Sequence, residues 1–183
     1  VGDELLVLTS SERASSLLKT LDMFVFPADK VRLADRSDAY AAYALIGPRA
    51  CAVLEAAALG SSPGNGVLVE LAGGLGYALA GVGLAVPGIT LLVRKGEEDD
   101  ALQALESVPG VLTISAAENE LLRLLQGRPR ASLDLKDINP LEAGLWGCVS
   151  FNKGCYTGQE TIAKLSRVGG PKQQVWGLRP TSA

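Results

Sequence analysis

Short apolar runs, bounded by Gly, Pro or clusters of polar residues, predict the strands of this chain. A bounded run of four to eight apolar residues is typical of a buried strand, whereas apolar residues spaced three and four apart form one face of a helix. The sequence therefore predicts strands at residues 4–9, 30–37, 39–46 and 111–114, and further strands within residues 71–93.

Helical spacing of the apolar residues predicts five helices, at about residues 12–23, 48–59, 97–107, 115–126 and 158–169. The first is expected to bury one face, formed by Ala14, Leu17, Leu18 and Leu21. Three of the helices follow a capping box, in which a hydroxyl and a carboxylate three residues later bond free backbone N–H groups. The boxes are Thr9-Ser-Ser-Glu12, Ser115-Ala-Ala-Glu118 and Thr157-Gly-Gln-Glu160.

Residues 71–93 contain no charged side chain and are long enough to cross a bilayer as one helix. The pairs Gly73-Gly74 and Pro87-Gly88 divide this stretch, and such residues mark turns and bulges between strands. We therefore interpret it as buried sheet, with a membrane-associated helix as the alternative. Strands and helices alternate without a strict βαβ rhythm, which predicts the α+β class.

The amino-acid composition excludes or disfavours several classes of function. The 183 residues are 48% hydrophobic and 20% charged, which indicates a globular chain with a substantial core. A formal net charge of −3 argues against general binding to nucleic acids or anionic membranes. The absence of histidine excludes His-based proton relays and His metal sites. Three cysteines without a C-x-x-C pair indicate a reducing compartment and disfavour a zinc site.

Cys155 is the candidate reactive group. It lies two residues before Thr157, the expected N-terminal capping residue of the last helix. Free N–H groups and the helix dipole favour an anion at such a position. Lys153 adds a positive charge, and Gly154 and Gly158 allow a tight turn. The alternative is a small buried thiol, the usual environment of a free cysteine. A disulfide or a shared metal with Cys148 stays open, whereas Cys51 is expected in the core.

The segment Lys153-Gly-Cys-Tyr-Thr-Gly-Gln-Glu160 resembles the K-G-C-[FY]-x-G-Q-E motif of the YgfZ/GcvT-like folate-binding family. Asn139-Pro-Leu-Glu-Ala-Gly-Leu145 upstream and Glu160-Thr-Ile-Ala-Lys-Leu165 downstream are also similar to the family. The likeness extends more loosely over the whole chain. The sequences of residues 24–30 and 140–146 are most similar to the plastid and cyanobacterial branch of the family.

The resemblance implies a GcvT-like fold, with mixed or antiparallel sheets and flanking helices, related to the aminomethyltransferase (T-protein) of the glycine cleavage system. It implies a tetrahydrofolate-binding protein that assists the assembly or maintenance of iron–sulfur proteins in the chloroplast, with mitochondrion or bacterial cytoplasm as alternatives. Cys155 and Lys153 would carry the chemistry. The folate contacts would come from Glu142, Gly154, Tyr156, Gly158, Gln159 and Glu160.

Glu142 is assigned because residues 141–144 resemble the T-protein stretch whose glutamate bonds the pterin ring, and a carboxylate can accept two N–H bonds. A surface carboxylate, or one that starts a helix, is the alternative. The chain is expected to form one domain over residues 1–178, followed by a tail at 179–183. Compared with the family, the aspartate-bearing N-terminal part and the C-terminal barrel are expected to be missing. Other candidate functions are an aminomethyltransferase and a non-catalytic folate scaffold.

Overall fold

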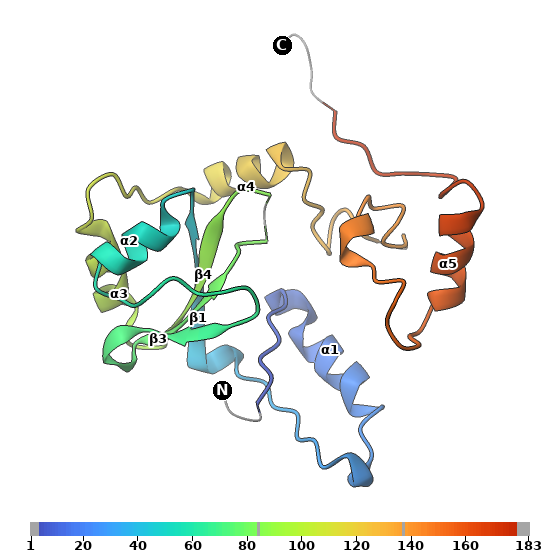
Figure 1. Cartoon of the computed structure of the whole chain (residues 1–183), viewed down its shortest axis with the longest axis horizontal. Helices are drawn as coiled ribbons and strands as arrows, with labels where there is room; N and C mark the ends of the chain where they lie inside the picture. Colours follow the sequence, from blue (N-terminus) through green and yellow to red (C-terminus); the bar gives the residue numbers. More distant parts are fainter. Residues whose placement is uncertain (1–3, 84, 137, 179–183) are drawn as a thin grey trace. The chain divides into compact units, whose positions relative to one another are not determined.

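The computed structural model describes residues 4–83, 85–136 and 138–178. The chain divides into two compact units, Val1–Asn119 and Glu120–Ala183. The expected tail at 179–183 lies outside the described residues. Figure 1 shows that the first unit holds a sheet with helices, and that the second holds a helix with long irregular segments.

A four-stranded antiparallel sheet forms the centre of the first unit, with strand order β1-β4-β3-β2. The strands are β1 (Tyr40–Ile46), β2 (Leu68–Glu70), β3 (Gly76–Ala80) and β4 (Gly88–Arg94). The uncharged stretch 71–93 is sheet, as predicted, and it turns at the two expected places, next to Gly73-Gly74 and Pro87-Gly88. Among the described residues, none of the helices has the length and hydrophobicity needed to span a bilayer.

Five α-helices occur in the described residues: α1 (Ser11–Asp22), α2 (Ala50–Ala56), α3 (Glu98–Glu106), α4 (Ala116–Leu125) and α5 (Gln159–Arg167). Four short 3₁₀ turns accompany them, at Pro27–Asp29, Ser37–Ala39, Ala72–Gly74 and Trp146–Cys148. Together with the sheet, they confirm the predicted α+β class. The structure by itself does not identify the fold as GcvT-like.

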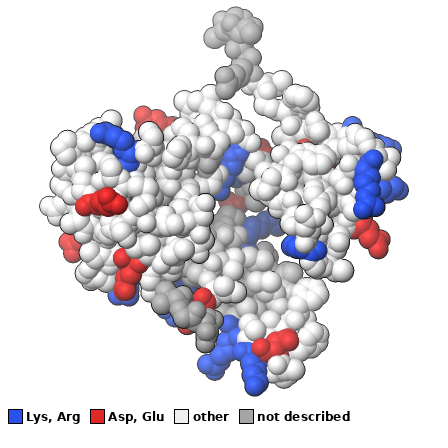
Figure 2. Space-filling view, viewed as in Figure 1, with Lys and Arg blue, Asp and Glu red and all other residues white. Residues whose placement is uncertain are grey.

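The core of the first unit lies where α2 and α3 pack on β4, and Figure 1 shows both helices on the same side of the sheet. Alternate β4 residues point to this face because side chains along a strand alternate. Ile89, Leu91 and Val93 are buried there with Leu54 of α2 and Leu105 of α3. In the described residues no polar or charged side chain is buried, and Figure 2 shows charged groups at the surface.

Three predicted strands are wrong. Residues 4–9, 30–37 and 111–114 lie outside the strands of the sheet, and Leu5 is 96% exposed. A strand needs a neighbour for its backbone hydrogen bonds, and the apolar pattern does not reveal whether one is present. The prediction of α1 is confirmed, but none of its residues is fully buried and Leu21 is exposed.

Only one of the three predicted capping boxes forms. Ser115 N–H donates to Glu118 Oε2 at 2.7 Å, and Glu118 N–H donates to Ser115 Oγ at 3.2 Å. Helix α1 begins after Ser10 without a side-chain cap, so the box at Thr9–Glu12 is wrong. The box at Thr157–Glu160 is also wrong, because α5 begins one residue later than expected. Gly158 is its cap, with φ of 85°, a left-handed conformation that glycine adopts readily.

Gly76→Ala tests the packing of the sheet. A Cβ atom at Gly76 would collide with the carbonyl oxygen of Leu92 on β4, and the φ of 150° disfavours any side chain. We expect the substitution to lower the free energy of unfolding by at least about 2 kcal/mol. Urea denaturation measures this change. Gly64→Ala is the matched control, because a Cβ there meets its nearest atom, Val67 Cγ2, at an ordinary 3.7 Å; equal stability of the two variants would contradict the sheet register.

Candidate functional site

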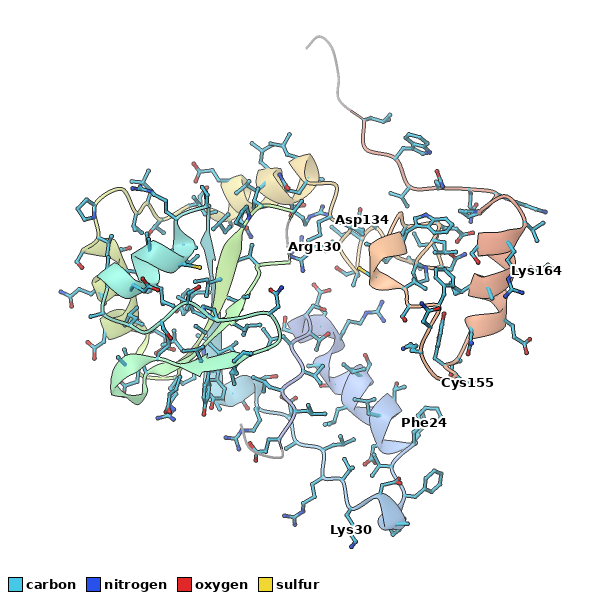
Figure 3. The ribbon with its side chains drawn as sticks, in the orientation of Figure 1. Phe24, Lys30, Arg130, Asp134, Cys155 and Lys164 are labelled. Atoms are coloured by element: carbon cyan, nitrogen blue, oxygen red, sulfur yellow. The ribbon has the colours of Figure 1, made fainter. Side chains whose placement is uncertain are left out.

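All candidate site residues lie in the second unit. An irregular segment follows the 3₁₀ turn Trp146–Cys148 and leads into α5, and it contains Cys155. Cys155 is a free, exposed thiol, three residues before the cap Gly158. Figure 3 shows Cys155 on the loop before α5. Among the described residues no hydrogen bond reaches its sulfur atom. The thiol is therefore open to solvent and to reagents, rather than packed as a small hydrophobic group.

Lys153 is held by an aromatic ring. Its Nζ lies 4.7 Å from the ring centroid of Tyr156, within the range of a cation–π contact. Tyr156 N–H in turn donates to Gln159 Oε1 at 3.3 Å, and Gln159 is the first residue of α5. These two contacts link three residues of the motif around Cys155 and place the charge of Lys153 on the loop that carries the thiol.

Glu142 belongs to a capping arrangement that we did not predict. Asn139 Oδ1 accepts hydrogen bonds from the N–H groups of Leu141 and Glu142, at 3.0 and 3.1 Å. Asn139 N–H donates to Glu142 Oε2 at 3.0 Å. Asn139-Pro-Leu-Glu142 has the spacing of a capping box with Asn in the first position, so the sequence did contain the signal.

A distant segment also contacts Glu142. Gln173 Nε2 donates to Glu142 Oε1 at 3.3 Å, and Val175 N–H donates to the backbone carbonyl oxygen of Glu142 at 2.9 Å. Leu141 beside it is fully buried. The carboxylate is therefore fixed in orientation, and it keeps acceptor capacity, since two oxygens offer about four lone-pair sites.

Two hollows lie in this unit. The one that we call the α5 hollow has a volume of about 280 Å³ and is lined by Ser150, Phe151, Tyr156, Gln159, Ala163, Ser166 and Arg167. The Glu142 hollow has about 210 Å³ and is lined by Ile138, Glu142, Gln173, Gln174 and Val175.

Only some of the predicted site residues line the two hollows. Glu142, Tyr156 and Gln159 line them, whereas Lys153, Gly154, Cys155, Gly158 and Glu160 do not. Sequence reasoning missed Phe151, Arg167 and Gln173, because a lone aromatic, a basic residue in a last helical turn and a loop glutamine carry no motif.

The residues fit a reduced folate in part. The free acceptor sites of Glu142 suit the N–H edge of a pterin, and Gln173 and Gln174 add further polar groups. Each hollow is smaller than the roughly 300–1,000 Å³ of typical ligand pockets, so either one alone holds only part of such a molecule. In residues 4–83, 85–136 and 138–178 no group of three or more Cys, Asp or Glu side chains is placed to hold a metal ion.

Arg123 of α4 organises the turn that precedes the site. It donates to Glu120 Oε1 at 2.7 Å and to Asp134 Oδ2 at 2.8 Å. Asp134 Oδ2 also accepts the N–H of Arg130 at 2.7 Å, and Figure 3 labels both residues. The backbone N–H of Arg130, followed by the Arg123 guanidinium, lowers the pKa of Asp134 below its ordinary value.

Comparison with known proteins adds one relative. No protein-family model matches the chain. The chain is 33% identical, over 183 residues and 95% of its length, to a protein of Arabidopsis thaliana named as a putative transferase, chloroplastic. It spans only 41% of the length of that relative. The name of this relative bears out the predicted chloroplast localisation. The chain is thus similar to a transferase-like protein.

Asp134→Asn tests the ionic contacts of this unit. Because the folded-state pKa of Asp134 is lowered, its stabilising contribution is present above the unfolded value of about 3.9 and is lost as pH falls through the folded value. We expect the variant to be less stable at pH 7 by about 1 kcal/mol or less, since the pair remains partly solvated. Urea denaturation at pH 7 and pH 3 should show a smaller pH difference in the variant than in the wild type; an unchanged difference would contradict the assignment.

Proposed function

We propose that this protein binds a reduced folate and assists the assembly or maintenance of iron–sulfur proteins in the chloroplast, with Cys155 as its reactive thiol. The observation that carries the proposal is the exposure of Cys155 on a loop whose neighbours, Tyr156 and Gln159, line a hollow. The resemblance of residues 153–160 to the folate-binding family's motif supports the same assignment.

The pterin ring of the ligand is assigned to Glu142. Its carboxylate is oriented by Asn139 and Gln173, so little conformational entropy is lost when it accepts further N–H groups. A bound reduced folate would supply a carrier for a one-carbon group. The chain's own contribution is to orient the pterin and to keep a thiol accessible near the start of α5.

Cys155 acts as a nucleophile or as a transient ligand to an iron–sulfur cluster that is passed to a client protein. The thiolate is the form that performs either task. Lys153 lies on the same loop, with its Nζ over the ring of Tyr156, and α5 begins at Gln159, four residues after Cys155. Iron–sulfur proteins or their assembly machinery are thus the proposed partners.

A one-carbon transferase is the second candidate, and the transferase name of the Arabidopsis relative favours it. An aminomethyltransferase would form methylene-tetrahydrofolate from an aminomethyl-lipoyl donor. The motif cysteine argues against it, because the T-protein resembled in fold lacks this motif. Incubation with that donor and tetrahydrofolate decides: product formation favours the transferase, and its absence with folate bound favours the first candidate.

Thiol reactivity tests the role of Cys155. At pH 7 we expect iodoacetamide to alkylate Cys155 several-fold faster than Cys148, although both are exposed, because only Cys155 precedes a helix start. Lys153→Met should slow the reaction, whereas Lys136→Met should not. Peptide mass spectrometry measures the rates. Equal rates at the two cysteines would remove the claim of an activated thiol.

Cys155→Ser tests the proposed role in cells. We expect the variant to fail to support iron–sulfur enzymes in a strain that lacks the native protein, while Cys148→Ser supports them. Folate binding, measured by calorimetry, should persist in the Cys155 variant. A Cys155→Ser protein that fully restores the enzymes would favour a non-catalytic scaffold instead.

A further inference from the structure

We propose that the α5 hollow is a docking site for an acidic segment of a partner protein, which it holds beside the thiol of Cys155. This inference rests on the proposed function for the identity of the partner, an iron–sulfur protein or a component of its assembly machinery. It deepens that function, because it gives the partner a chemical character: carboxylates next to an apolar side chain.

The openness of the hollow favours a protein partner. Its lining residues Ser150, Phe151 and Arg167 are exposed, and Phe151 keeps 50% of its surface in solvent. The other lining residues are only partly buried. Pockets for small molecules enclose most of the surface of their ligand. A hollow with exposed walls is better suited to a side chain that projects from another protein.

The types of residue in the lining are those of protein interfaces. Tyr, Phe and Arg are enriched in such interfaces, and Tyr and Arg are frequent among the residues that contribute most of the binding free energy. Tyr156 is also restrained before any partner binds. Its backbone N–H donates to Gln159 Oε1 at 3.3 Å, and Lys153 Nζ lies 4.7 Å from the centroid of its ring. Little conformational entropy is then lost on docking.

The polar groups of the hollow favour carboxylates. Arg167 offers a planar, permanently charged set of N–H donors, and among the described residues no ion pair involves its guanidinium. Gln159 accepts the N–H of Tyr156 with Oε1, which leaves its amide N–H groups available. The lining residues include no Asp or Glu. An acidic segment therefore meets donors without meeting a like charge.

The charges around the hollow are also mostly positive. After Glu142, the described residues carry Lys153, Lys164, Arg167 and Lys172 against Glu160 as the acidic side chain. Such a field speeds association with an acidic partner. A nucleic acid fits less well, because binding to its phosphates uses several cationic side chains and the lining of the hollow contains one.

The position of the hollow gives the docking a purpose. Cys155 is bonded directly to Tyr156, which lines the hollow, so their Cα atoms are about 3.8 Å apart. The thiol itself is exposed. A segment held in the hollow thus lies next to a thiol that is free to react, and holding two reactants together lowers the barrier between them.

Proximity-driven alkylation of Cys155 tests the proposal. The probe is a peptide with a central phenylalanine flanked by glutamates and a chloroacetyl group at its N-terminus. The Cys155 thiolate displaces chloride from this group and forms a thioether. A peptide docked in the hollow raises the effective concentration of the chloroacetyl group at the thiol. We expect it to label Cys155 at least about threefold faster than a matched peptide with glutamines in place of glutamates, on the scale of one partly exposed ion pair.

Two substitutions on α5 locate the effect. Arg167→Gln should remove the difference between the two peptides. Lys164→Gln is the matched control and should keep it, because Lys164 lies on the same helix but does not line the hollow (Figure 3). Arg167→Glu should reverse the preference, so that a peptide with lysines in place of glutamates reacts fastest. An unfolded variant cannot produce that gain. Mass spectrometry of the labelled peptides measures every rate.

The outcomes separate this inference from the proposed function. Equal labelling of the wild type by the acidic and the neutral peptide overturns the docking site and leaves the proposed function standing. A preference that persists in Arg167→Gln also overturns it. Stronger protection of Cys155 by oligodeoxythymidylate than by the acidic peptide without its chloroacetyl group overturns it in favour of a nucleic acid. A preference that depends on Arg167 supports the docking site, even if Cys155→Ser restores the iron–sulfur enzymes and the proposed role of the thiol fails.

Discussion

The candidate site depends on the hydrogen bonds that join residues 173–175 to the turn at Asn139–Glu142. Leu141, Ala143 and Ile162 are the buried apolar residues among those described in the second unit, so hydrophobic packing alone supplies little rigidity there. Instead, hydrogen bonds from Gln173 and Val175 hold Glu142 in place. Gln173 lies 31 residues further along the chain. The Glu142 carboxylate is therefore held in a defined orientation by bonds at both of its oxygen atoms.

The loop before α5, which contains Cys155, presents chemical groups other than a carboxylate. Its thiol is exposed, its lysine is held over Tyr156, and its glutamine lies at the first position of α5. The hollow next to it is lined by Tyr156, Gln159 and Arg167 among others, whereas the other hollow is lined by Glu142 and two glutamines.

Sequence patterns predicted the elements whose signal is local. The uncharged stretch 71–93 contains its own breakers and folds into sheet as expected, and Ser115–Glu118 forms the predicted cap. The strand at residues 4–9 failed because pairing depends on a neighbour elsewhere in the chain. The cap at Thr157 failed because Gly158 adopts a left-handed conformation and moves the start of α5 by one residue.

Local patterns also limited the prediction of the site. The motif predicted Tyr156 and Gln159, which line a hollow, and it predicted the thiol, which is exposed. Arg167 and Gln173 were missed because their positions depend on how α5 and the last described segment fold back. The capping pattern at Asn139–Glu142 was readable in the sequence, with Asn in place of the more familiar Ser or Thr.

The most direct test of this account is protection of the thiol by the ligand. The rate of Cys155 alkylation should be measured with and without saturating tetrahydrofolate. Cys51, which is exposed and not in the core as the sequence predicted, serves as internal control. If the folate lies beside the motif loop, the rate at Cys155 falls while the rate at Cys51 does not, and Glu142→Gln removes the effect. Demonstrated folate binding with an unchanged rate at Cys155 would contradict a site shared by the thiol and the ligand.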